Sequence, residues 1–241
     1  MKFEKEYYVE IQDIGLKNKM TNYAFLSKLE EIASDHSNTV GYGAKDIEEK
    51  KKAWLLMDWK LKVIERPGYN QKLKIKTWAR PIEKQPFFTY RDFEIFEGEK
   101  RVAIATSKWI LFDLKTNRIG KITDDIIKLY HPEKECVFEE SDIEKIKEKT
   151  EIGQAISYEV KRSDIDINKH MHNLNYLQLA YEALPEDIYF GEEKNNVRIM
   201  YKHQILLGDK VKCYYINSNG KDIITIKSED NRVLHSIVEL S

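Results

Sequence analysis

Two stretches of sequence decide how this chain is organised: IQDIGLKNKMTNYAFL at residues 11–26 and RSDIDINKHMHNLNYL at residues 162–177. They align without a gap when residue 11 is placed opposite residue 162. Residues of the same kind stand at the positions expected to be structural: Asp13 with Asp164, Ile14 with Ile165, Leu16 with Ile167, Met20 with Met171, Asn22 with Asn173, Phe25 with Tyr176 and Leu26 with Leu177. Self-similarity at a fixed spacing indicates an internal repeat, so we expect two copies of one structural unit.

Each stretch leads into a predicted helix that is followed by predicted strands. The first helix is expected from about Asn22, a plausible N-cap, to Asp35, and the second from about Asn173 to Leu184, where Pro185 ends it. Residues rich in Val, Ile, Thr and aromatic side chains predict strands at 53–65, 71–80, 87–96 and 101–114, and again at 196–206, 210–217, 222–227 and 233–240. A helix followed by antiparallel-looking strands is an α+β pattern.

The repeat and the composition between its copies divide the chain into three segments. Residues 1–122 are expected to form an N-terminal unit, and residues 153–241 a C-terminal unit. Residues 123–152 are dominated by charge and contain Pro132, which predicts a connector with helical pieces.

Composition excludes several classes of protein. The 241 residues include 40 basic and 41 acidic side chains, mixed along the chain, which argues against nucleic acid as the main partner. The start of the sequence, MKFEKEYYVEIQD, is too charged for a secretory signal, and no apolar run approaches a membrane span of about 20 residues. We therefore expect a cytoplasmic protein that does not bind membranes.

No metal or other cofactor is expected. The two cysteines, Cys136 and Cys213, lie far apart in sequence and lack the paired spacing of a zinc or redox motif. The scattered histidines also show no metal-ligand spacing: His36, His131, His203 and His235.

The two stretches differ at alternate positions, and these differences point to chemistry. Opposite Gly15, Lys17 and Lys19 of the first stretch, the second has Asp166, Asn168 and His170, which we call the polar trio. If residues 164–170 are extended, the trio shares one face, while Ile165 and Ile167 anchor the other face. The trio would then project into a cavity.

These residue types in this order suit hydrolysis of an acyl bond. Histidine gains and loses a proton near neutral pH, so His170 could act as base and acid. Asp166 could hold the imidazole or help to activate water, and the Asn168 amide could donate to a substrate oxygen. The first N–H groups of the following helix, at residues 173–176, could stabilise an oxyanion.

Asp, Asn and His are also common where a strand turns into a helix, because they cap the helix and bond local backbone. Capping alone would have served both copies equally well. Since only the second copy has the polar trio, the comparison between the copies favours catalysis there.

The second stretch resembles the signature of the acyl-ACP thioesterases, the plant chloroplast enzymes and their bacterial relatives. That signature is an Asp-x-Asn-x-His segment that runs into Asn-x-x-Tyr, and the matching residues are Asp166, Asn168, His170, Asn173 and Tyr176. Glu182 matches an acidic position of the family, whereas His172 stands where the family usually has Asn. Residues 53–81 and 105–122 also look like first-half strands of those enzymes.

The resemblance implies a double hotdog fold, with two tandem repeats that each consist of a long helix wrapped by an antiparallel sheet. It further implies hydrolysis of a fatty acyl chain from the phosphopantetheine arm of acyl carrier protein, which terminates fatty acid synthesis. Asp166 and His170 would carry catalysis, Asn168 would orient substrate or oxyanion, and Asn173 and Tyr176 would help to position substrate. The first unit would supply much of the acyl-chain pocket.

One departure from the family affects the expected mechanism. A carboxylate is often proposed in a Tyr-(Arg/Lys)-x-Glu context, which here reads Tyr201, Lys202, His203 and Gln204. Gln204 could position a water molecule but could not act as a base.

Three other functions remain open at this stage. An acyl-CoA thioesterase would use the same chemistry on a different carrier. A non-catalytic acyl-thioester binding protein is favoured slightly by Gln204 and opposed by the intact polar trio. A hotdog dehydratase ranks below both. Two fused repeats could act as a monomer, and a homodimer is equally compatible with the sequence.

Overall fold

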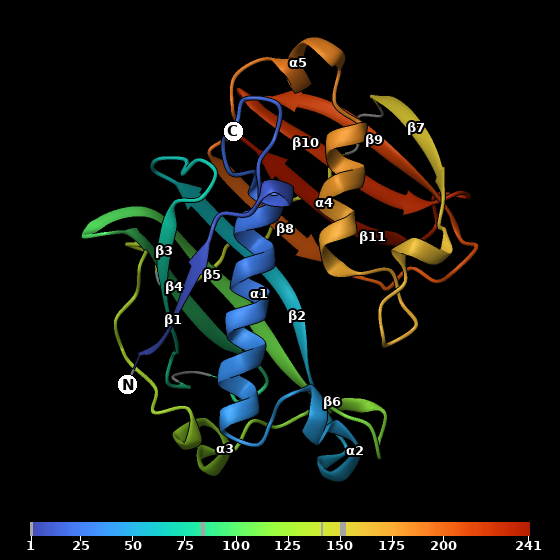
Figure 1. Ribbon diagram of the computed structural model, residues 1–241. Coiled ribbons are helices and arrows are strands. Elements are labelled where there is room, and N and C mark those ends of the chain that lie inside the picture. Colours follow the sequence, from blue (N-terminus) through green and yellow to red (C-terminus); the bar gives the residue numbers. More distant parts are fainter. Residues whose placement is uncertain (1, 83–84, 141, 150–152) are drawn as a thin grey trace. The chain divides into compact units, whose positions relative to one another are not determined.

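The computed structural model describes residues 2–82, 85–140, 142–149 and 153–241 (Figure 1). The chain divides into two compact units, residues 1–143 and residues 144–241. Each unit consists of an antiparallel sheet and one principal helix, which confirms the α+β class and the repeat. In the described residues, no helix is long and apolar enough to cross a membrane.

The first unit contains six strands in the described residues. They are β1 (Phe3–Tyr8), β2 (Lys52–Val63), β3 (Lys72–Ala79), β4 (Thr89–Glu97), β5 (Lys100–Asp113) and β6 (Arg118–Gly120). The order in the sheet is β1-β3-β4-β5-β2, with β6 paired to β5. The principal helix is α1 (Asn22–Thr39), and short helices are η1 (Ile11–Asp13), η2 (Ala44–Asp46), α2 (Ile47–Lys50) and α3 (Asp124–Leu129).

Helix α1 lies against this sheet through the apolar positions that its sequence spacing predicts. The side chains it buries include Phe25, Leu26, Leu29, Ile32 and Ala33. The N-cap is Thr21, whose side chain accepts from the Ala24 N–H, so the expectation that Asn22 caps the helix was wrong by one residue. The helix also continues past Asp35 to Thr39.

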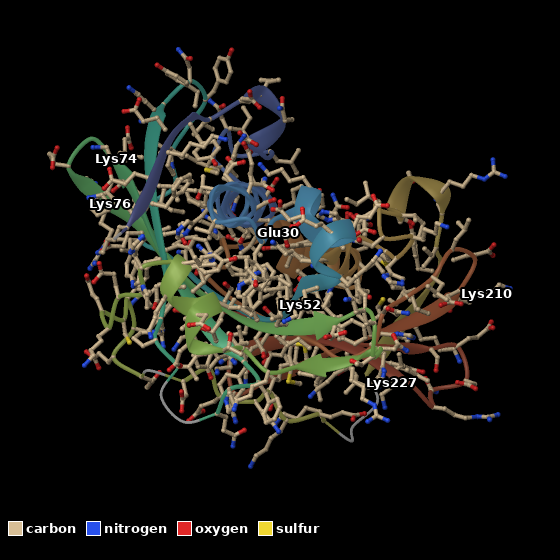
Figure 2. The ribbon with its side chains drawn as sticks, turned by 90° about the horizontal axis from the view of Figure 1, so that it is seen from below. Glu30, Lys52, Lys74, Lys76, Lys210 and Lys227 are labelled. Atoms are coloured by element: carbon tan, nitrogen blue, oxygen red, sulfur yellow. The ribbon has the colours of Figure 1, made fainter. Side chains whose placement is uncertain are left out.

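Strand β3 shows the period of two that a half-buried strand requires. Leu73 and Ile75 are buried, while Lys74 and Lys76 point away from the core (Figure 2). Across the β1–β3 pair, Lys76 meets Glu4 at 3.4 Å. This face of the sheet is therefore a mixed, solvated surface.

The second unit repeats the plan with a shorter helix. Its strands are β7 (Gln154–Glu159), β8 (Asn196–Tyr201), β9 (Lys210–Ser218), β10 (Lys221–Ser228) and β11 (Leu234–Leu240), in the order β8-β11-β10-β9-β7. The helices are η3 (Arg162–Asp164), α4 (Asn173–Glu182) and α5 (Glu186–Phe190). Helix α4 ends at Glu182, two residues earlier than predicted, and Pro185 then caps α5.

The segment expected to be a connector contributes to the first unit. Ile126, Ile127 and Tyr130 are buried together with Ala79 and Leu111. Further along, the Trp78 indole N–H donates to the Glu135 carbonyl at 2.9 Å. The division between the units therefore falls between residues 143 and 144, inside the predicted connector. Residues 150–152 of that connector lie outside the described residues.

Candidate active site

The polar trio lies in a closed turn. The Asp166 N–H donates to the His170 carbonyl at 2.9 Å, and an isolated bridge pairs Ile165 with Met171. The Lys169 N–H donates back to the Asp166 carbonyl at 3.0 Å, with a positive φ of 65° at Lys169. The expectation of an extended strand was therefore wrong, because a turn with a left-handed residue replaces strand alternation.

The turn also changes the role expected of Ile167. Its side chain is 85% exposed at the tip of the turn, so it does not anchor the segment. Ile165 is half-buried and belongs to the bridge with Met171. Anchoring thus comes from main-chain bonds across the turn instead of from a pair of buried isoleucines.

The structure brings the members of the polar trio together through Asp166. One carboxylate oxygen, Oδ1, accepts from the Asn168 N–H at 2.8 Å and from the His170 N–H at 3.4 Å. The other, Oδ2, accepts from Asn168 Nδ2 at 3.3 Å. Both bonds between Asp166 and His170 use the main chain of His170, so in this structure Asp166 stabilises the turn. Asn168 is exposed and His170 is half-buried.

Asp164 fastens the turn to its surroundings. Its carboxylate accepts from the Tyr158 hydroxyl at 2.8 Å and from the Lys161 N–H at 2.7 Å. Its carbonyl accepts from the His172 N–H at 2.8 Å and from Asn175 Nδ2 at 3.1 Å. The residue therefore connects strand β7, the turn and the start of α4. The identity of Asp13 and Asp164 in the aligned stretches was the signal for it.

His172, which sequence reasoning did not include in the site, is the N-cap of α4. Its Nδ1 accepts from the Leu174 N–H at 3.2 Å, and its carbonyl accepts from the Asn175 N–H at 2.9 Å. Burial lowers the pKa of His172, and the Asp166 charge opposes that effect. An imidazole that accepts at Nδ1 is neutral and carries its proton on Nε2. Its place directly before the predicted helix was an available signal.

The cap narrows the choice of oxyanion donors at the helix start. Because His172 takes the N–H groups of Leu174 and Asn175, these are not available to a substrate. The Asn173 N–H has no hydrogen-bond acceptor among the described residues. The expected group of donors at residues 173–176 thus loses Leu174 and Asn175, and we take Asn173, the first of the group, as the candidate.

Tyr176 holds the loop that follows β8. Its side chain is 3% exposed, and its hydroxyl donates to the His203 carbonyl at 3.4 Å. The ring packs edge-on against Tyr201 with 5.4 Å between centroids, and burial raises the pKa of Tyr176. The Tyr201 hydroxyl in turn donates to the Asn173 carbonyl at 3.1 Å. These contacts fix the loop of Gln204 beside the helix start.

Gln204 is exposed in that loop. The Met171 N–H donates to the Ile205 carbonyl at 2.8 Å, which ties the loop to the turn directly after His170. The turn, the start of α4 and the loop after β8 therefore come together within the second unit. Among the described residues, no group of His, Cys, Asp and Glu could hold a metal ion.

Comparisons with known proteins identify the family of this chain. The family model described as the acyl-ACP thioesterase N-terminal domain matches residues 1–130, and the C-terminal domain model matches residues 144–238. The chain belongs to the acyl-ACP thioesterase family. This also confirms the resemblance read from the sequence.

The curated relatives of this family member are distant in sequence. Oleoyl-acyl carrier protein thioesterase 2 of Arabidopsis thaliana is 21% identical, over 92% of this chain and 65% of the relative. The palmitoyl-acyl carrier protein thioesterase of Cuphea hookeriana is 20% identical, over 84% of this chain and 51% of the relative. The chain therefore spans less than two thirds of the length of these curated relatives.

Solved structures of the family share the fold. An acyl-ACP thioesterase from Bacteroides thetaiotaomicron superposes with a TM-score of 0.86 at 19% identity, covering 99% of this chain and 96% of the other. The 12:0-ACP thioesterase from Umbellularia californica gives 0.87 at 13% identity, over 100% and 96%. The double hotdog fold expected from the sequence is thus confirmed.

Within this thioesterase-family chain, the first unit contains a closed copy of the same site. The Gly15 N–H donates to the Lys19 carbonyl at 2.9 Å, and the Met20 N–H donates to the Pro67 carbonyl at 2.8 Å. Pro67 therefore occupies the place of Ile205, which puts Arg66 in the place of Gln204. The Arg66 side chain, 8% exposed, turns back onto the helix start.

The guanidinium of Arg66 closes that copy through two hydrogen bonds. Nη1 donates to the Met20 carbonyl at 2.8 Å, and Nη2 donates to Asn22 Oδ1 at 2.9 Å. This buried cation uses the polar groups at the start of α1, so we call the first copy closed. In the second copy the corresponding residue, Gln204, is exposed, and this copy also has the polar trio.

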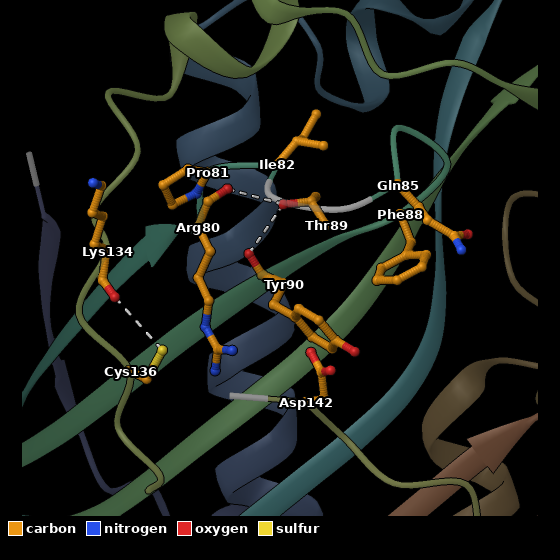
Figure 3. A pocket seen from close by; sticks show the side chains of 10 residues that line it. All are labelled: Arg80, Pro81, Ile82, Gln85, Phe88, Thr89, Tyr90, Lys134, Cys136 and Asp142. Carbon is orange, nitrogen blue, oxygen red and sulfur yellow. Dashed lines mark hydrogen bonds between the residues drawn. The ribbon is translucent and has the colours of Figure 1, made fainter. Parts of the chain in front are cut away.

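A separate pocket of about 70 Å³ opens on the first unit, between the end of β3 and residues 134–142 (Figure 3). Arg80, one of its lining residues, is already paired, because the buried Asp92 accepts two hydrogen bonds from Arg80 and one from Thr106. Tyr90 stacks on the Arg80 guanidinium at 5.0 Å. These groups stabilise the sheet, and the pocket is not part of the candidate active site.

Proposed function

We propose that this chain hydrolyses fatty acyl thioesters carried on the phosphopantetheine arm of acyl carrier protein. The observation that carries the proposal is the difference between the two copies. In a member of the acyl-ACP thioesterase family, the polar trio occurs directly before the helix start of the second unit, where Gln204 is exposed. The first unit lacks the trio, and the buried Arg66 is bonded at the start of its helix.

The proposed reaction uses one water molecule and no cofactor. His170 takes a proton as the water oxygen bonds to the thioester carbon, and the carbonyl electron pair moves to oxygen. The Asn173 N–H and the Asn168 amide donate to that oxyanion. When the intermediate collapses, the carbon–sulfur bond breaks and His170 returns the proton to sulfur. The products are the free fatty acid and the carrier thiol.

Asp166 supports this reaction in two ways. Its bonds to Asn168 and to the His170 main chain preserve the turn. Its carboxylate also accepts from Asn168 Nδ2, which orients the amide that donates to the oxyanion. Gln204 has a neutral amide, so we assign it to positioning and not to proton transfer. Tyr176 positions the loop that carries Gln204.

The division of labour is also part of the proposal. Residues 1–122 would supply much of the acyl-chain pocket, and residues 153–241 would supply the catalytic groups. We place the protein in the cytoplasm, a reducing compartment, because its two cysteines lie far apart in sequence without the paired spacing of a disulfide framework. A monomer and a homodimer both fit the proposal.

The test is release of free thiol from a panel of acyl carrier protein and CoA thioesters by the purified protein. His170→Ala should reduce the rate at least about 100-fold, because general acid–base catalysis contributes that much or more. Lys19→Ala is the matched control at the same turn position of the first unit and should change the rate little. Equal losses in both variants would contradict the assignment.

One observation favours a second candidate. Gln204 stands where the family often has a carboxylate, so the chain could bind acyl thioesters without cleaving them. Tight binding of an acyl carrier protein thioester without thiol release would establish this alternative. Release from CoA alone would instead identify an acyl-CoA thioesterase.

A further inference from the structure

The carbonyl of Met171 is a buried acceptor beside the candidate site. Met171 is 3% exposed, and its N–H is used by the Ile205 carbonyl. In the described part of the chain, no group donates to the Met171 carbonyl, and the Asn173 side chain makes no hydrogen bond. Buried main-chain carbonyls are nearly always paired in folded proteins, so this one needs a donor.

The first unit reveals the chemistry that fits this position. The equivalent acceptors there are the Met20 carbonyl and Asn22 Oδ1, and both receive N–H groups from Arg66. The same pair of acceptors is therefore built in both copies at the same place in the fold. In the first copy the donor belongs to the chain.

In the second copy the residue at that place, Gln204, does not supply the donor. Gln204 has two side-chain atoms fewer than arginine between its Cα and its terminal nitrogen, and it is exposed. It therefore ends short of where the Arg66 guanidinium reaches. The polar groups that correspond to the closed site are then the acceptors of Met171 and Asn173 and the amide of Gln204. Such a set of two to four polar partners is what an ordered water requires.

We propose that the Met171 carbonyl and the Asn173 side-chain oxygen hold the hydrolytic water, with Gln204 as a neutral third partner. This inference rests on the proposed function. Asn173 also presents its main-chain N–H to the oxyanion, so one residue aligns the nucleophile with the carbonyl it attacks. One water proton bonds to the acceptor pair, and the other is transferred to His170, the neighbour of Met171 in sequence.

The first test transfers the arginine of the closed copy to the open one. Gln204→Arg should place a guanidinium on Met171 and Asn173, as Arg66 does on Met20 and Asn22. We expect kcat to fall at least about 100-fold, because the water is displaced, while the KM for the acyl thioester stays within about 2-fold. The thermal midpoint should be unchanged or higher. Gln204→Met, similar in length but without donors, is the control and should lose less than about 10-fold.

The second test asks directly whether water is the occupant. Asn173→Ala should lower kcat, and in the presence of methanol it should increase the ratio of methyl ester to free acid, because water loses its positioned acceptor. Asn173→Ala could instead raise the KM for the carrier thioester, without changing the ester-to-acid ratio or the turnover of a short thioester that lacks amides. That result would mean that the acceptors of Met171 and Asn173 bind an amide of the phosphopantetheine arm, and the inference would be wrong. Unaltered kinetics in Gln204→Arg would also overturn it.

The outcome can be separated from failure of the proposed function. A wild-type protein that cleaves no thioester contradicts the proposed function itself. A wild-type protein that cleaves acyl carrier protein thioesters, but whose variants behave as in the overturning results, retains the function and loses only the water site.

Discussion

The turns at residues 14–20 and 165–171 have nearly the same backbone and different chemistry. Each is closed by a bridge between an isoleucine and a methionine, and each has a left-handed residue, with φ of 56° at Asn18 and 65° at Lys169. Each is fastened by an aspartate and by one bond to the neighbouring loop. The comparison teaches that main-chain bonds define the scaffold, while a few side chains decide whether it is open.

The largest effect should come from exchanging the turns. Replacing the polar trio by its first-unit counterparts, Asp166→Gly, Asn168→Lys and His170→Lys together, should reduce kcat/KM about 10⁴-fold or more, since base and oxyanion donor are both lost. Steady-state thiol release measures this. Circular dichroism should show a folded protein, because the first unit makes the same turn with those residues.

The reverse exchange supplies the control for that prediction. Introducing Asp, Asn and His at positions 15, 17 and 19 should not produce a second active site, because Arg66 still covers the start of α1. Activity in the doubly exchanged protein would contradict the view that the arginine closes this copy.

The next prediction compares the contributions of Arg66 and Gln204 to the stability of the protein. Arg66→Met leaves the Met20 carbonyl and the Asn22 side chain buried without their donor, so we expect the free energy of unfolding to fall by about 2–4 kcal/mol. Gln204→Met should change it by less than about 0.5 kcal/mol, since the side chain is exposed. Urea denaturation of both variants measures the two changes. An equal loss of unfolding free energy in both variants would contradict the prediction.

A smaller difference is expected between the two tyrosines that precede the turns. Tyr158→Phe removes the hydrogen bond to Asp164 and should cost about 1 kcal/mol in the free energy of unfolding. Tyr7 is at the equivalent position, and in the described structure its hydroxyl makes no bond to Asp13. Tyr7→Phe should therefore cost less than Tyr158→Phe. A larger loss for Tyr7→Phe, measured in the same urea series, would contradict this.

The smallest effect concerns the helix caps, because Thr21 does not titrate and His172 does. Burial lowers the pKa of His172, so the unfolded chain binds more protons than the folded chain as pH falls below about 6.5. The stability contributed by this cap is thus complete above that pH and decreases in acid. Protonation also removes the Nδ1 acceptor of the Leu174 N–H.

His172→Asn should keep a cap that does not titrate. We expect the free energy of unfolding of the wild type to fall by up to about 1 kcal/mol more than that of the variant between pH 7 and pH 5. His36, whose pKa burial lowers to about 3, adds an acid-labile contribution that is common to both proteins. Parallel pH profiles for the two proteins would contradict the prediction.

Much of the fold could be predicted from the sequence, because its signals are periodic. The spacing of Phe25, Leu29 and Ile32 identified α1, and the aligned stretches revealed the repeat before any coordinates. The burial of α3 against the first sheet was missed, since charged neighbours hide the apolar set of Ile126, Ile127 and Tyr130. The segment around α3 is rich in charged residues, but its few buried apolar residues determine how it packs.

The site was predicted in its residues and not in its geometry. Proximity of Asp166, Asn168 and His170 followed from spacing, yet a period of two could not distinguish a strand from a turn with a left-handed Lys169. The roles of His172 and Arg66 depend on where side chains fold back onto a helix start. That information becomes available only when the loop after β2 is aligned with the loop after β8 through the bonds to Met20 and Met171.

Arg66 has a consequence for how this protein should be handled in solution. Its head group is chemically the guanidinium ion. Because Arg66 is part of the chain, that group is held at the start of α1 at a high effective concentration. Guanidinium chloride would therefore compete for the acceptors at Met171 and Asn173 and not for those at Met20 and Asn22. We expect it to inhibit at concentrations far below unfolding, which makes urea the appropriate denaturant for separating loss of function from loss of fold.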